Sequence, residues 1–197
     1  MISIHPYLKY KFLNSLFAGL SIGAVFVIYL PLEPIVFSIG GLGLAVFSYI
    51  VARLYMRLLN LKSFVRINLF IEVLMFFTII YFLLSTQDFM SALVVYLAYQ
   101  IMFGFGGYIY RAETLLLHKK PIIKAPDVAK QKGYIVGMLL SLGYFKLMGT
   151  FLDDKFTQVY YIHFFLLVLQ VFVLWFLYRA FYSSKSAQKP SVAENFD

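Results

Sequence analysis

The chain has 197 residues, of which 62% are hydrophobic and only 13% are charged. Roughly a quarter of the residues in a soluble domain are charged, so this composition excludes an ordinary water-soluble fold. No cysteine is present, which excludes disulfides, thiol catalysis and cysteine-bound metals. The net charge of +8 is explained by where the basic residues lie, and no nucleic-acid partner is expected.

Apolar stretches follow one another along the chain, each long enough to cross a hydrocarbon core about 30 Å thick as a helix. They cover residues 12–30, 35–52, 67–84, 90–110, 134–150 and 158–178. The first is too long for the core of a cleavable signal peptide, so we interpret it as a span. The predicted fold class is all-α, a polytopic membrane protein of six transmembrane helices over residues 1–182. The polar segment 183–197 is expected to be a disordered cytoplasmic tail.

The connectors between these spans alternate in charge. Fifteen of the 17 lysines and arginines lie before the first span, in the second-to-third and fourth-to-fifth connectors, or after the sixth span. The opposite connectors hold Glu33, Asp88, Asp153 and Asp154, with Lys146 and Lys155 as their positive charges. The positive-inside rule therefore predicts that both termini are cytoplasmic, and we expect a bacterial inner-membrane protein surrounded by lipid bilayer. The connector 118–132 contains two prolines and predicts a structured or membrane-grazing loop.

One acid, Glu72, lies well inside a predicted span, and Asn68 precedes it by one helical turn on the same face. Ionisable residues in spans are costly and often mark a solute or proton pathway. The alternative is a structural ion pair between Glu72 and Arg66 or Arg111 near the cytoplasmic end. The sequence leaves both interpretations open.

The fourth span has a face that is polar, then open, then cationic, made by Tyr96, Gln100, Gly107 and Arg111. This pattern predicts either one wall of an aqueous cavity, with Gln100 near its middle, or an interhelical hydrogen bond with glycines for close packing. The predicted cavity or coupling residues are Asn14, Asn68, Glu72, Tyr96, Gln100, Arg111 and Gln170.

Glycines four residues apart occur in the first and fifth spans, at Gly19 and Gly23 and at Gly133 and Gly137. This spacing favours close packing of helix backbones within the bundle, with contact to another subunit as the alternative. No signature of a hydrolase, a metalloprotease or a phosphate-binding loop is present. We therefore expect neither an enzyme nor a bound metal or cofactor.

Three segments share features with one transporter family. The connector 52–57 is similar to a G-x-x-x-D-R loop motif. It has the arginine, Arg57, but Met56 replaces the acid. The segment 100–107 follows an R-x-x-x-G-x-G pattern with Gln100 in the arginine position, and a glycine-rich fifth span contains Gly133, Gly137 and Gly143. In these features residues 12–180 resemble one six-helix half of a major facilitator superfamily transporter.

The resemblance implies two three-helix repeats of inverted topology, residues 12–84 and 90–178, with the first and fourth helices lining a cavity and Arg57 in a gating loop. It implies a half-size secondary carrier of a small solute that works by alternating access. Because the chain supplies one half, the expected working unit is a parallel homodimer, or a pair with another half-transporter chain. The alternatives are a substrate-binding membrane subunit resembling those of energy-coupling-factor importers, and a non-transporting membrane scaffold or regulator.

Overall fold

The computed structural model describes residues 2–85, 88–117 and 120–182, and this part of the chain is helical with no strand. The helices are α1 (Ile4–Ile28), α2 (Pro34–Arg53), the short α3 (Tyr55–Leu58), α4 (Leu61–Leu84), α5 (Phe89–Leu117), α6 (Lys120–Met148) and α7 (Lys155–Phe181). The predicted all-α class is confirmed. The tail predicted over 183–197 lies outside the described residues.

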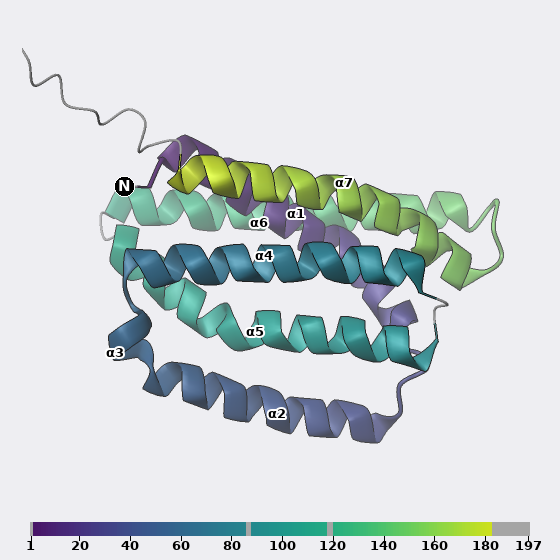
Figure 1. The fold of residues 1–197 in the computed structure, drawn as a ribbon. Coiled ribbons are helices and arrows are strands. Elements are labelled where there is room, and N and C mark those ends of the chain that lie inside the picture. Colours follow the sequence, from purple (N-terminus) through teal and green to yellow (C-terminus); the bar gives the residue numbers. More distant parts are fainter. Residues whose placement is uncertain (1, 86–87, 118–119, 183–197) are drawn as a thin grey trace, which may run out of the picture.

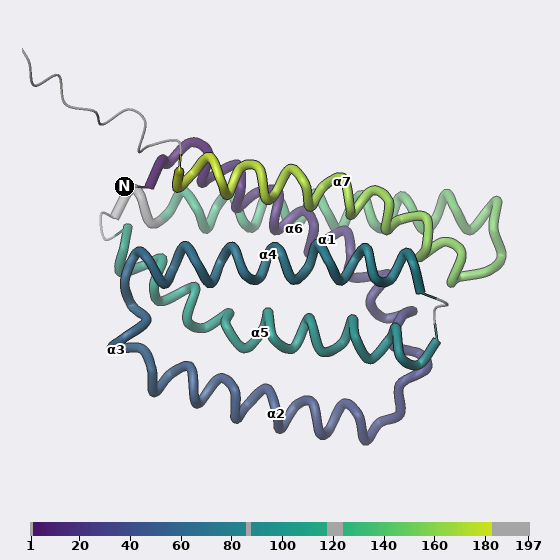
Figure 2. Tube along the Cα trace, viewed as in Figure 1, coloured from purple at the N-terminus to yellow at the C-terminus, as the bar shows by residue number. Residues whose placement is uncertain are grey.

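The six long helices pack in the spatial order α6, α1, α7, α4, α5 and α2. Helix α1 packs against α6 and α7, α4 joins α7 to α5, and α2 packs mainly on α5. Figure 1 shows that the long helices lie along a common axis, and the trace in Figure 2 shows that consecutive long helices run in opposite directions. The start of α1, the short α3, the end of α5, the start of α6 and the end of α7 all lie at one end of the bundle (Figure 1). Because the predicted basic connectors meet here, we call it the basic end.

Five helices, α1, α2, α4, α5 and α7, are long and apolar enough to cross a membrane, which is compatible with an integral membrane protein. Helix α6 is not among them, because lysines and other polar residues fill its first half and its apolar stretch is short. The membrane crossing predicted for 134–150 therefore stays a prediction.

Helix α6 corrects the predicted loop over 118–132, because the chain is helical from Lys120 onward. Pro121 falls in the first turn, where the missing N–H of proline would have no helical partner in any case. Pro126 lies inside the helix and is buried. Packing along α1 thus outweighs the local preference of proline for a helix end.

Glycines let the backbones of α1 and α6 come into contact. A Cβ atom added at Gly137 would meet the carbonyl oxygen of Leu16 and lie 2.9 Å from the backbone nitrogen of Leu20. A Cβ added at Gly19 would meet the backbone of Tyr134 in the same way. The predicted close packing of these glycines within the bundle is therefore observed.

Candidate functional site

The carboxylate of Glu72 lies in the middle of α4, and only 2% of the residue is exposed. Its Oε1 accepts hydrogen bonds from the Tyr10 hydroxyl at 2.8 Å and from Asn14 Nδ2 at 2.7 Å, both from α1. Its Oε2 accepts a bond from Gln170 Nε2 of α7 at 2.8 Å. Three neutral donors from two helices therefore hold the carboxylate in place.

Asn68 extends this group by one turn of α4. Its Oδ1 accepts a second, longer bond from the Tyr10 hydroxyl, at 3.1 Å. Its Nδ2 donates to the carbonyl oxygen of Phe64 at 2.8 Å, and this bond fixes which way the amide points. Asn68 and Glu72 share a helix face because residues four apart stack along an α-helix.

Gln170 of α7 holds Glu72 in position. The residue is completely buried, and its Nε2 also donates to the backbone carbonyl oxygen of Glu72 at 2.9 Å. Its Oε1 has no hydrogen-bond partner within the described part of the chain. One amide thus ties α7 to both the backbone and the side chain of Glu72.

The alternative ion pairs of Glu72 are not formed. Within residues 2–85, 88–117 and 120–182, neither Arg66 nor Arg111 lies within ion-pair distance of this carboxylate. Arg66 is exposed on α4, and the guanidinium of Arg111 lies 5.5 Å from the centre of the Tyr55 ring. Burying a carboxylate away from water is costly, and the three hydrogen bonds to Glu72 offset that cost in place of an ion pair.

A second buried carboxylate, Glu113, lies toward the basic end. Its Oε1 accepts a bond from the Tyr7 hydroxyl at 2.8 Å, and its Oε2 pairs with Lys11 Nζ at 2.8 Å. The ammonium group of Lys11 also lies 5.9 Å from the centre of the Tyr7 ring. This cluster ties the start of α1 to the end of α5.

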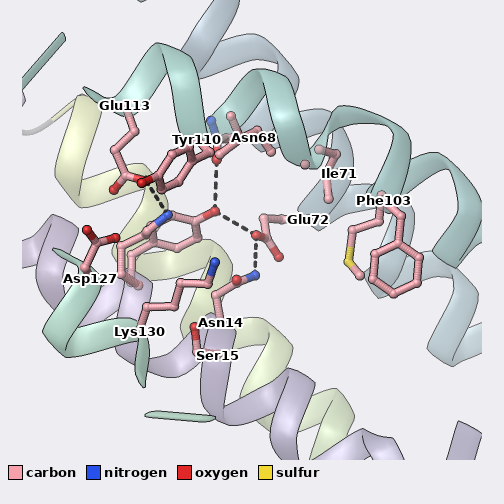
Figure 3. A pocket seen from close by; sticks show the side chains of 15 residues that line it. Asn14, Ser15, Asn68, Ile71, Glu72, Phe103, Tyr110, Glu113, Asp127 and Lys130 are labelled. Atoms are coloured by element: carbon pink, nitrogen blue, oxygen red, sulfur yellow. Dashed lines mark hydrogen bonds and ion pairs between the residues drawn. The ribbon is translucent and has the colours of Figure 1, made fainter. Parts of the chain in front are cut away.

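A cavity of about 240 Å³ lies between these two carboxylates (Figure 3). Helices α1, α4, α5 and α6 line it, through Tyr10, Lys11, Asn14, Ser15, Asn68, Ile71, Glu72, Met102, Phe103, Gly106, Ile109, Tyr110, Glu113, Asp127 and Lys130. At about 30 Å³ for each water molecule, the space matches about eight waters. The cavity is thus suited to a small solute and combines charged, amide and apolar walls.

Side-chain contacts join α1 and α5 toward both ends of the bundle, with the cavity between these contacts. Toward the basic end they are joined by Lys11 and Glu113. Toward the other end the Tyr99 hydroxyl donates to Ser21 Oγ at 3.1 Å, and the rings of Tyr29 and Tyr96 pack edge to face. Exposed residues of α5 and α6, such as Phe103 and Lys130, are part of the cavity lining.

The structure brings together three of the predicted residues, Asn14, Asn68 and Glu72, at the cavity. Gln170 touches Glu72 from α7. Glu72 therefore has a different set of contacts from the ion pairs that the sequence left open, and its role in transport stays a prediction.

The other predicted residues do not line this cavity. Tyr96 is buried between α5 and α2, where its hydroxyl lies 3.4 Å from the carbonyl oxygen of Phe37. Gln100 is half-buried, and its buried Oε1 has no partner among the described residues. Arg111 and Arg57 are exposed, the latter on the short α3.

Sequence reasoning missed Lys11, Glu113, Asp127 and Lys130. These residues lie beyond the apolar runs, in parts of α1, α5 and α6 that were interpreted as connectors. A usable signal was present in α1, where Lys11 lies three residues before Asn14 and so shares its face.

No family model, curated protein or solved structure matches this chain.

Proposed function

We propose that the chain is a membrane carrier of a small solute, a half-size transporter with the architecture of one major facilitator half that works as a parallel homodimer by alternating access. The observation that carries the proposal is the cavity with Glu72 at its floor, set among helices long enough to cross a membrane. A buried ionisable group at such a depth is expensive, and it is typical of solute and ion pathways.

The packing of the helices supports an inverted repeat. The first three-helix unit is α1, α2 and α4, and its counterparts in the second unit are α5, α6 and α7. When each helix is exchanged with its counterpart, the contact of α1 with α6 becomes the contact of α5 with α2, which is also observed. The same exchange converts the α1–α7 contact into the α5–α4 contact and leaves the α4–α7 contact unchanged. Such a pattern is expected of two three-helix units related by a pseudo-twofold axis in the membrane plane.

The glycines add to this symmetry. Gly19 and Gly137 bring α1 and α6 together, and in the exchanged pair Gly40 of α2 packs on Tyr96 while Gly104 of α5 packs on Phe47. In the first pair the glycines let two backbones touch, and in the second they make room for an aromatic ring of the neighbouring helix.

The exposed part of the cavity lining supports a dimer. Phe103 of α5 and Lys130 of α6 line the cavity and are exposed on the surface of a single chain. A second copy inserted in the same direction would cover these residues and complete the site. Parallel insertion follows from the strong charge bias, since the positive-inside rule would act on both copies alike.

The test is counterflow exchange in proteoliposomes, which needs no knowledge of the coupling ion. The probes are radiolabelled amino acids, quaternary amines, sugars and carboxylates. Wild-type protein should exchange at least one of these classes, and Glu72→Gln should lower that exchange at least tenfold. The matched control is Glu33→Gln, which removes an exposed carboxylate at the start of α2 and should leave exchange unchanged. Absence of exchange with every probe, from protein that is folded and dimeric, would contradict the proposal.

A further inference from the structure

The cavity holds a buried carboxyl group, Glu72, that forms no ion pair within residues 2–85, 88–117 and 120–182. Its side chain accepts hydrogen bonds from Tyr10, Asn14 and Gln170, none of which is charged. A carboxylate has about four acceptor positions, and these three bonds leave one. Because Glu72 lines the cavity, an ammonium group of a solute would supply the missing counter-charge.

The same cavity holds a cation without an anionic partner. Lys130 of α6 lines it and forms no ion pair within the described part of the chain, whereas Lys11 is neutralised by Glu113. Figure 3 shows Lys130 pointing toward Asn14 and Glu72, and Asp127 lying nearer Glu113. Among the described residues that line the cavity, the exposed Lys130 and Asp127 and the buried Glu72 thus form no ion pair.

Apolar side chains form another part of the cavity lining. Ile71 comes from α4, and Met102, Phe103 and Ile109 come from α5. Specific small-molecule sites commonly combine such a wall with a few placed polar groups. A solute with both charges and a small apolar part would fit the volume of about 240 Å³.

We infer that the site takes a small zwitterion of the amino-acid class, with its ammonium group on Glu72 and its carboxylate on Lys130. This inference rests on the proposed function and names its substrate class. Five charged side chains line the cavity: Lys11, Glu72, Glu113, Asp127 and Lys130.

Calorimetric titration of the wild-type protein in lipid nanodiscs tests the assignment with two sets of matched probes. Leucine is compared with isoamylamine, which lacks the carboxylate, and with 4-methylpentanoate, which lacks the ammonium group. Alanine, ethylamine and propionate form a smaller set. At least one amino acid should bind at least tenfold more tightly than both of its fragments.

Variants locate the two charges. Glu72→Gln and Lys130→Gln should each weaken amino-acid binding at least tenfold. Lys146→Gln, at an exposed lysine near the other end of α6, should leave binding unchanged. Circular dichroism of each variant shows whether it is folded, and the comparison of the fragments on the wild-type protein stands even where a variant does not fold.

Two outcomes would overturn the assignment. One is an amine or a carboxylate that binds as tightly as its parent amino acid, and the other is absence of binding by all six probes. Counterflow of a sugar that depends on Glu72 would also overturn it and yet leave the proposed carrier function standing. Absence of counterflow with every class, by contrast, removes the function itself.

Discussion

The contact between α1 and α6 gives a prediction whose magnitude follows from the structure. A Cβ at Gly137 would meet the backbone of Leu16 and Leu20, which cannot move aside as a flexible side chain can. A Cβ at Gly143, on the same helix, meets nothing within 4 Å. Both substitutions to alanine add the same intrinsic helix preference, about 0.5–1 kcal/mol in favour of the folded state. The difference between the two variants therefore isolates the steric cost.

Overpacking of this kind costs about 1–3 kcal/mol. We expect Gly143→Ala to match the wild type or to be slightly more stable, and Gly137→Ala to be less stable than Gly143→Ala by about that amount. For a chain of this size the gap corresponds to roughly 2–4 °C in Tm for each kcal/mol. Thermal unfolding in detergent, followed by circular dichroism, measures it.

Equal stability of Gly137→Ala and Gly143→Ala would refute the close approach of these two helices. A further check is the double variant Gly19→Ala with Gly137→Ala, because a Cβ added at either glycine would lie close to the Cα of the other, at 3.1 and 3.0 Å. Their effects should not add.

The remaining predictions concern the polar clusters and one helix end. Tyr10→Phe removes the hydroxyl shared by two acceptors and should lower the free energy of unfolding by about 1–3 kcal/mol, measured by denaturant titration. A double-mutant cycle of Lys11→Met and Glu113→Gln should give a coupling energy on the order of 1–2 kcal/mol, and additive effects would contradict the ion pair. At the start of α7, hydrogen bonds from the side chain and backbone of Thr157 hold the pKa of Asp154 below its usual value, so its stabilising effect is present at neutral pH and lost as the pH falls through that lowered pKa. Asp154→Asn should remove this acid dependence, and unfolding followed between neutral and acidic pH should show it.

The apolar runs predicted the helical fold because the hydrocarbon core demands long stretches without charge. For the same reason they predicted too little of α1, α4 and α5, which continue toward the basic end beyond the runs. Lys11 and Glu113 lie in these continuations. Hydropathy predicts the part of a helix that contacts lipid, and it does not predict the part that extends past the lipid into water or protein.

The candidate site was predictable on α4 and less so on α5. Asn68 and Glu72 stand out because polar residues in a span need partners. On α5, Gln100 and Arg111 share a face, but the residues that line the cavity, among them Gly106 and Glu113, lie roughly 120–160° away around the helix axis at 3.6 residues per turn. Helical periodicity groups residues on a face, and only tertiary packing decides which face meets the cavity.

The central claim is that a second copy completes the cavity, and one measurement tests it directly. The chain has no cysteine, so Phe103→Cys places a single spin label in the cavity lining, where the residue is 57% exposed. Phe172→Cys on α7, at 51% exposed, is the control on a face away from the cavity. In nanodiscs, pulsed electron paramagnetic resonance should give a distance between two copies for both variants, and the distance should be shorter for Phe103→Cys. Absence of dipolar coupling in both variants, or a shorter distance for Phe172→Cys, would contradict the account.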